Sequence, residues 1–209
     1  MLIAIAIFVS SCYTTGKYES GIAYSNNYLL ISPIFIGGRI VRANSVEYDS
    51  TLSSIAEKTL TECVYSYRDV MRFTDTLSAP EHVKINISKL DNVVSRFNSK
   101  KIGNLPTPPD LDSLIESNGY RYGMVIIGNG FSRPIGNTIG WSAMAVVTGA
   151  LTGAYMTPRM NNCCTVHAFV IDASEHKIIS AKTSGYFDKN PTKKGVVETA
   201  FKKTFNIRN

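Results

Sequence analysis

The chain has 209 residues, of which 44% are hydrophobic and 18% charged, as expected for one globular domain with short appendages. This composition excludes a charge-rich disordered chain and a membrane protein with many spans. The net charge is +6. Its late cluster, interpreted as the solvated side of a terminal helix or, alternatively, a contact for anionic lipid headgroups, comprises Lys189, Lys193, Lys194, Lys202, Lys203 and Arg208. No zinc-finger spacing or arginine-rich arm occurs, so we expect no nucleic-acid partner.

An uncharged apolar run, Leu2 to Val9, begins the chain. It is shorter than the roughly 20 residues that cross a bilayer, but it has the length of the apolar region of a secretory signal. Val9-Ser10-Ser11-Cys12 follows directly. This pattern resembles the lipobox of bacterial lipoproteins. The resemblance implies a signal peptide at 1–11, a diacylglycerol on the Cys12 thiol and, because Tyr13 rather than Asp follows, an outer-membrane location facing the periplasm. The alternative is a buried N-terminal strand.

The next segments predict a tether and the first half of a domain. Residues 12–27 are polar and read as the tether, and the domain covers 28–209. Tyr28 to Ile36 predicts a core strand closed by Gly37-Gly38, with Pro33 at an edge or a bulge. Asp49 or Ser50 caps a helix, and Val83 to Ile87 and Lys89 to Phe97 predict a strand and a helix. The buried face of the long helix is predicted to hold Leu52, Ile55, Ala56, Thr59, Leu60, Cys63, Val64 and Tyr67.

The second half alternates a short helix with strands. After the stiff connector 106–109, Asp110 is expected to open a helix that Asn118-Gly119 closes. Strands follow at Met124–Ile127, Val166–Ile171 and Lys177–Tyr186, the last two joined by a turn. Thr192 is expected to cap a final helix with Val196, Val197, Ala200, Phe201 and Phe205 inward. The order predicts a single α/β domain with a mixed sheet and an apolar, Gly/Ala-rich insertion at 131–162.

Two stretches add a family resemblance. The first, 118–128, reads Asn-Gly-Tyr-Arg-Tyr-Gly-Met-Val-Ile-Ile-Gly. The second is a hairpin with Phe-Val-Ile-Asp-Ala at 169–173 and Lys-Ile-Ile-Ser at 177–180. Together with the preceding strand and long helix, they resemble periplasmic lipoproteins related to the curli-secretion channel. The resemblance implies an α/β domain over about 28–206 and a role in a secretion or envelope assembly.

Residues 134–158 carry no charged side chain. Gly149 and Gly153 form one of two GxxxG spacings there, and Trp141 is the only tryptophan. A transmembrane helix and a membrane-inserting hairpin are two interpretations. We favour a third, in which the segment packs on its own domain or on a second copy, with Trp141 as an anchor. Such a long apolar segment predicts self-association or an envelope complex.

Catalytic signatures are missing from the sequence. Gly-x-Ser-x-Gly, a P-loop and a strand-led dinucleotide motif are absent, and His82, His167 and His176 have no partner at a catalytic spacing. Cys63 is interpreted as core, and its bridge to Cys163 or Cys164 is left open. We therefore expect no catalytic residue, cofactor or metal and a non-enzymatic lipid-anchored protein. The alternatives are an envelope hydrolase on cell-wall or glycan material and a ligand-binding lipoprotein.

Overall fold

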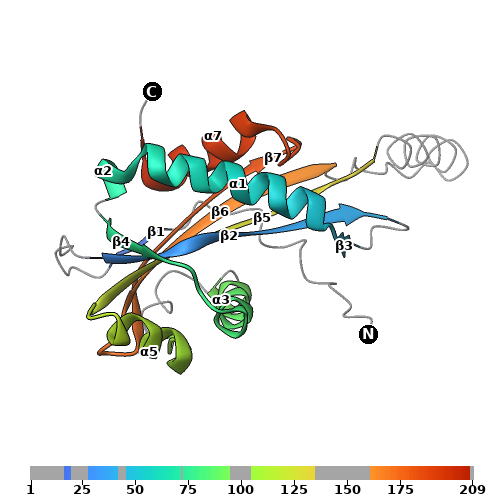
Figure 1. The fold of residues 1–209 in the computed structure, drawn as a ribbon. Helices are drawn as coiled ribbons and strands as arrows, with labels where there is room; N and C mark the ends of the chain where they lie inside the picture. The colour runs from blue at the N-terminus through green and yellow to red at the C-terminus, as the bar shows by residue number, and fades with distance from the viewer. Residues whose placement is uncertain are drawn as a thin grey trace, which may run out of the picture.

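The domain is a sheet covered by helices on both faces (Figure 1). The computed structural model describes residues 17–19, 28–41, 46–71, 73–94, 105–134 and 161–207. Helices α1 (Ser50–Ser66), α2 (Arg68–Met71) and α7 (Lys194–Phe205) lie on one face. Helices α3 (Glu81–Val94) and α5 (Pro109–Ser117) lie on the other. This arrangement confirms the predicted single α/β domain with a mixed sheet.

The seven strands of the sheet run in the order β1-β7-β6-β5-β2-β3, and β4 also pairs with β2. Strand β2 is parallel to β5 and β4, whereas the remaining pairs are antiparallel. The strands are β1 (Lys17–Glu19), β2 (Tyr28–Ile40), β3 (Val46–Tyr48), β4 (Phe73–Leu77), β5 (Tyr122–Ser132), β6 (Asn162–Asp172) and β7 (Lys177–Phe187). Residues 17–19, within the expected tether, thus form an edge strand.

Strand β2 is longer and more central than the sequence suggests. Gly37 and Gly38 lie within it rather than closing it, and both pair with β5. The register with β5 shifts between Ile31 and Ile34, so the bulge predicted at Pro33 is confirmed. The other side of β2 is shared by β4, which pairs with residues 28–31, and β3, which pairs with residues 38–40. Among the described strands neither pairs with Pro33, so the predicted edge position also holds locally. The register shift and this local edge together let a proline occupy the strand.

Helix α1 confirms the Asp49 cap and most of the predicted face. The Asp49 side chain accepts a hydrogen bond from the Leu52 amide at 2.9 Å. Cys63 is buried as expected, but Ile55 is 44% exposed. The reason is the docking of the helix start on β2, where the Gly37 amide donates to the Ser53 hydroxyl at 2.9 Å. Ser53 therefore takes the inward position.

Helix α3 replaces the strand predicted at Val83 to Ile87. The alternation that suggested a strand includes Ile85, which is 49% exposed. The buried positions are instead Val83, Ile87 and Leu90, the i, i+4, i+7 pattern of a helix. The helical prediction at Lys89 to Phe97 is confirmed as far as Val94, where the described part of α3 ends. Helix α2 and strand β4 were not expected.

The later helices differ from expectation only at their starts. Helix α5 begins at Pro109, one residue before Asp110, which suits proline at a first helical position. Gly119 follows the helix with φ of +80°, a conformation that glycine adopts easily. Helix α7 begins at Lys194, and Thr192 does not cap it because its hydroxyl donates to the Asn190 side chain at 2.9 Å.

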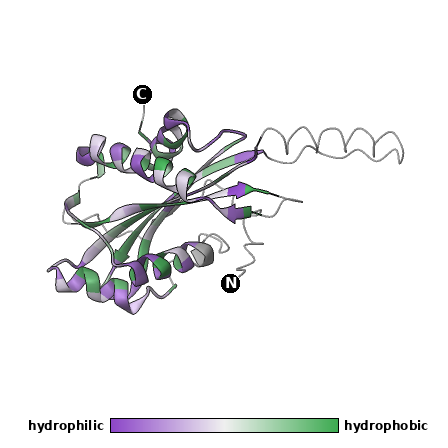
Figure 2. Cartoon of the chain, turned by 45° about the vertical axis from the view of Figure 1, so that its right-hand side comes forward, coloured by the Kyte–Doolittle hydropathy of each residue, from purple (hydrophilic) through white to green (hydrophobic). Residues whose placement is uncertain are grey.

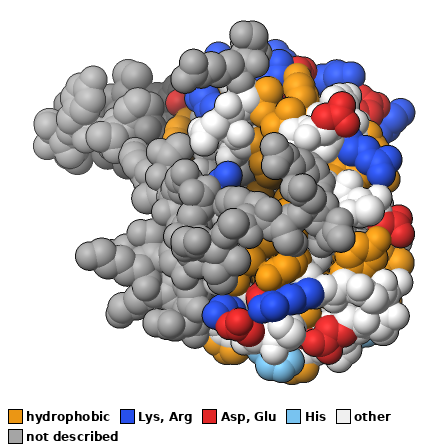
Figure 3. Space-filling view, turned by 90° about the vertical axis from the view of Figure 1, so that its left-hand side faces the viewer, with side chains coloured by type: hydrophobic (Ala, Val, Ile, Leu, Met, Phe, Trp, Pro, Cys, Tyr) orange, Lys and Arg blue, Asp and Glu red, His pale blue; other side chains and the backbone are white. Residues whose placement is uncertain are grey.

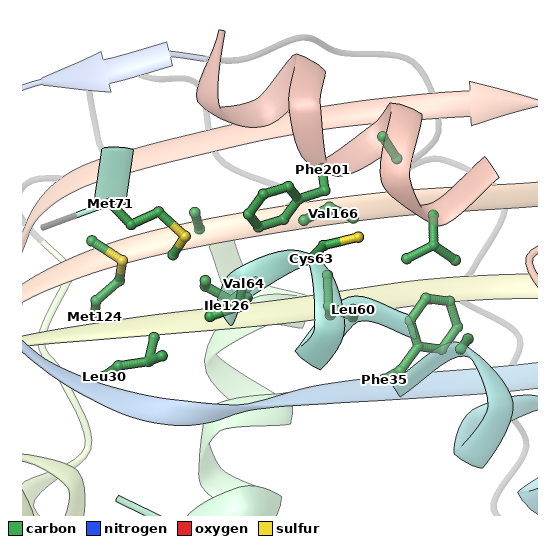
Figure 4. Packing of buried hydrophobic residues seen from close by; sticks show 14 of the residues in the cluster. Leu30, Phe35, Leu60, Cys63, Val64, Met71, Met124, Ile126, Val166 and Phe201 are labelled. Atoms are coloured by element: carbon green, nitrogen blue, oxygen red, sulfur yellow. The ribbon is translucent and has the colours of Figure 1, made fainter. Parts of the chain in front are cut away.

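Two apolar layers hold the helices to the sheet, and Figure 2 shows green hydrophobic positions along the helices beside the sheet. The layer under α1 and α7 includes Leu60, Val64 and Phe201, seen together in Figure 4. The opposite layer includes Ile87, Ile115 and Phe169. Gly128 allows the Phe35 ring to cross β5, because a Cβ there would lie 2.1 Å from that ring. Every residue of these layers lies between Tyr28 and Ile207.

Candidate functional site

The residues predicted to anchor or assemble the protein lie outside the described part of the chain. Cys12 is one of them, as are Trp141, Gly149 and Gly153 of the insertion. Strand β5 extends to Ser132 and β6 begins at Asn162, so the described chain reaches both ends of the expected insertion. The lipidation and assembly predictions therefore stay predictions.

The described strand nearest to Cys12 in sequence is β1. It pairs antiparallel with β7, with Lys17 opposite Lys182 and Glu19 opposite Ser180. Five residue steps separate Cys12 from Lys17, and an extended chain covers at most about 17 Å in five steps.

A cavity of about 270 Å³ lies beside the β1–β7 edge, on the α1/α7 face of the sheet. Its floor comes from four strands, and its walls come from α2 and the end of α7. Figure 4 shows Met71 and Met124 side by side in this region, beyond Val64 and Ile126. The lining residues are Tyr28, Val70, Met71, Met124, Ala168, Val170, Ser180, Lys182 and Phe205.

The cavity is hydrophobic apart from its β7 side. Seven of its nine lining residues are hydrophobic, and the other two are Ser180 and Lys182. The two methionines are unbranched and can adapt their shape to a ligand. The Tyr28 ring is held by an edge-on contact with Tyr122, with centroids 6.2 Å apart. Chemically, the cavity can take an apolar group that ends in a polar or anionic one.

The opposite face contains a buried polar cluster, which we define as Asp91, Asn129, His167 and Thr183. The first three are 3%, 6% and 1% exposed. The Asn129 amide donates to Asp91 Oδ2 at 2.5 Å. His167 Nδ1 lies 3.0 Å from the Thr183 hydroxyl and 3.4 Å from Asp91 Oδ1. Helix α3 and strands β5, β6 and β7 thus meet through polar groups.

This polar cluster is incompletely satisfied. Asp91 Oδ1, Asn129 Oδ1 and His167 Nε2 are buried without a hydrogen-bond partner. Burial raises the pKa of Asp91, although the charge of His167 and the hydrogen bond from Asn129 oppose the shift. Neither described cavity is lined by these residues. The cluster therefore costs stability, and a substrate has no described route to it.

The other two histidines lie at the surface. His82 is exposed at the start of α3. His176 is 68% exposed in the β6–β7 turn, and its Nδ1 lies 3.0 Å from Asp112 Oδ2. The Thr107 hydroxyl donates to the same carboxylate. These bonds fasten the turn to the start of α5.

The bridge from Cys63 to Cys163 or Cys164 that the sequence left open does not form, although Cys163 itself is disulfide-bonded. Cys63 and Cys164 are free and buried. Burial raises the pKa of Cys63 to about 11 and that of Cys164 to about 12, so neither is a reactive thiolate at neutral pH. Cys163 and Cys164 point to opposite faces of β6, as neighbours on a strand do. Among the described residues, no group of three acidic, histidine or cysteine side chains is arranged for a metal.

Three lysines of the late basic cluster, Lys194, Lys202 and Lys203, lie on α7, as the interpretation of a solvated helix side expected. Lys189 and Lys193 precede the helix, whereas Arg208 lies outside the described residues. Lys194 pairs with Glu62 of α1 at 2.9 Å, and Lys202 pairs with Glu198 at 2.9 Å. Lys203 lies 4.8 Å from the centroid of the Tyr186 ring. No helix in the described ranges combines the length and apolar character needed to cross a bilayer.

No family model and no curated protein matches the sequence. Among solved structures, the chain is similar to a PelC dodecamer from Paraburkholderia phytofirmans, at 12% identity over 94% of this chain and 99% of that chain, with a TM-score of 0.38. It is also similar to lipoprotein GNA1162 from Neisseria meningitidis, at 11% identity over 86% and 95% of the two chains, with a TM-score of 0.35. Protein XCC0632 from Xanthomonas campestris follows at 8% identity, 92% and 85% coverage and a TM-score of 0.33. These values support no transfer of function.

Sequence reasoning missed both the cavity and the polar cluster. The residues that line the cavity come from six separate helices and strands, so no local sequence pattern predicts it. The polar cluster had one signal: His167 interrupts an apolar strand, and a buried histidine needs polar partners. Asp91 could not be recognised as such a partner, because the sequence divided this region into a strand at 83–87 and a helix at 89–97.

Proposed function

We propose that this chain is a lipid-anchored cell-envelope protein whose α/β domain is held beside the membrane. The observation that carries the proposal is the sequence Val9-Ser10-Ser11-Cys12 directly after a short apolar run. The pairing of β1 with β7 adds a geometric consequence, because Lys17 lies only five steps beyond Cys12. Diacylglycerol at Cys12 would keep the β1–β7 edge toward the bilayer. The location that follows from the sequence is the outer membrane, facing the periplasm.

The anchor is tested by growing cells that express the full chain with labelled palmitate and analysing the N-terminal peptide by mass spectrometry. We expect label in the natural protein, cleavage before Cys12 and no label in Cys12→Ala. The matched control is Cys63→Ala, which should keep the label because Cys63 is buried. An unlabelled protein with its first eleven residues intact, or with Cys12 in a disulfide, would overturn the proposal.

The second part of the proposal is assembly, with other copies or with an envelope complex, rather than catalysis. It rests on the uncharged stretch 134–158, which is long for an exposed apolar segment. Light scattering on residues 13–209, with and without 134–158, tests self-association. We expect a larger species only when the stretch is present. A monomer in both cases, together with no co-purifying envelope protein from detergent extracts, would exclude assembly.

An envelope hydrolase is less well supported by the described geometry. Such an enzyme needs a cleft in which histidine or carboxylate side chains converge. The structure brings His167 of β6 to Asp91 of α3, but both are buried between this helix and the sheet. The exposed His176 is engaged with Asp112 outside both described cavities. We therefore propose a non-enzymatic role.

A further inference from the structure

The cavity on the α1/α7 face has a volume and a lining that suit one hydrocarbon chain. An apolar cavity of about 150 Å³ already holds benzene, whereas sites for drug-sized ligands start at about 300 Å³. At about 270 Å³, this cavity is larger than the benzene-sized cavity and smaller than a site for a drug-sized ligand. Its walls are methionine, aromatic and aliphatic side chains. A single acyl chain fits this size and lining better than two chains.

The charge on the β7 side selects the head of the ligand. Lys182 and Ser180 lie two residues apart on β7 and both line the cavity. Lysine binds a carboxylate or phosphate as a point charge, and the hydroxyl can donate a hydrogen bond to it. A ligand with an apolar chain and an anionic head therefore satisfies both parts of the lining.

The position of the cavity favours a ligand taken from a membrane. Ser180 and Lys182 pair directly with Glu19 and Lys17 of β1, the strand nearest to Cys12. Val70 of α2 lines the cavity and is 55% exposed, so the lining reaches the surface. Figure 3 views the side of the molecule where α2 lies in Figure 1 and shows hydrophobic side chains at the surface between charged ones.

We propose that this cavity binds one anionic single-chain lipid, with the chain between Met71 and Met124 and the head at Lys182. The lipid is a free fatty acid or a lysophospholipid. The protein's own acyl groups are less suited, because diacylglycerol on a thioether carries no charge for Lys182. The inference takes its membrane setting from the proposed lipid anchor, but lipid binding itself needs no acylation of Cys12.

The test uses residues 13–209, which keep every residue of the described core. A fluorescent fatty acid is bound and then displaced with palmitate or with uncharged hexadecanol. We expect one site per chain and about tenfold preference for palmitate, and Lys182→Met should remove that preference. Lys177→Met is the matched control on the same strand, outside the cavity, and should retain it.

A second pair of variants tests where the lipid binds without disturbing the core. Val70→Asp adds a negative charge to the cavity lining and should weaken palmitate binding at least tenfold. Ile85→Asp changes a similarly exposed apolar residue on the opposite face and should leave binding unchanged. Absence of displaceable binding, or equal effects of Val70→Asp and Ile85→Asp, would refute the site.

The full, acylated protein from envelopes distinguishes the two sources of the chain. If it binds palmitate as residues 13–209 do, the ligand is a free lipid. If only residues 13–209 bind, the cavity is filled by the protein's own acyl group and the proposed occupant is wrong. A failure of palmitate labelling at Cys12 with retained lipid binding would overturn the anchor alone.

Discussion

The two faces of the sheet are built on the same strands but are stabilised differently. The face under α1 and α7 packs apolar side chains around the hydrogen-bonded hydroxyls of Ser184 and Thr204, and the cavity at its end adds Lys182 and Ser180. The face under α3 and α5 is apolar around a polar cluster with unpartnered atoms. Well-packed apolar contacts contribute most to stability, whereas buried unpaired polar atoms oppose it. The first face therefore combines packing with the cavity proposed to bind a lipid, and the second tolerates a buried polar cluster that lowers stability.

The strongest way to break the α1/α7 face is to remove a side chain from its centre. Leu60 is fully buried, so Leu60→Ala should lower the free energy of unfolding by about 2–5 kcal/mol. Ile55→Ala on the same helix should change it by about 0.5 kcal/mol or less, because Ile55 is exposed. Urea unfolding followed by circular dichroism measures both. Equal losses would show that α1 is rotated from the position described.

A smaller effect is expected at Asp172, a buried carboxylate that has a cationic partner. Burial opposes its ionisation, but hydrogen bonds from Arg121 and Ser174 lower the pKa of Asp172 below its usual value. A carboxylate whose pKa is lower in the folded state stabilises the fold at pH values above its unfolded pKa of about 3.9. This stabilisation is lost as the pH falls from there through the folded pKa. Asp172→Asn should therefore cost about 1–3 kcal/mol at pH 7 and progressively less in acid.

The unfolding free energy of Asp172→Asn is measured by urea titration from pH 7 to pH 3. Asp69→Asn, at an exposed position of α2, is the control for removing a carboxylate. A cost at Asp172 that is constant with pH would mean that its ionisation contributes nothing.

The smallest effect, of opposite sign, is expected at Asp91 in the polar cluster. Because burial raises the pKa of Asp91, the folded state holds this proton more tightly than the unfolded state. The associated stability is present below about pH 3.9 and is lost as the pH rises through the folded pKa. Between pH 4 and 7, Asp91→Asn should therefore have a higher free energy of unfolding than the natural protein, by about 1 kcal/mol or less. A variant that loses stability over that range would contradict the assignment.

The contrast between the two faces also explains what could be predicted from the sequence. Helix α1 and the core strands are long and periodic, so their patterns were sufficient to locate them. Helix α3 was divided because Ile85, an exposed apolar residue, imitated a strand alternation. Strand β1 has three residues and is specified by its partner β7 rather than by its own composition. The cavity and the polar cluster depend on side chains that only the tertiary fold brings together.

The place of β2 in the sheet has a consequence for the order of folding. Its first residue, Tyr28, pairs with Tyr122 of β5. The first long strand of the chain therefore cannot form this pairing until a segment more than ninety residues later has been synthesised. Parallel pairing across such a separation closes a large loop and slows folding. Until β5 has been synthesised, the thirteen mostly apolar residues of β2 have no partner strand on the β5 side. We expect that this protein reaches its native topology only after more than half of its length has left the ribosome or the translocation pore.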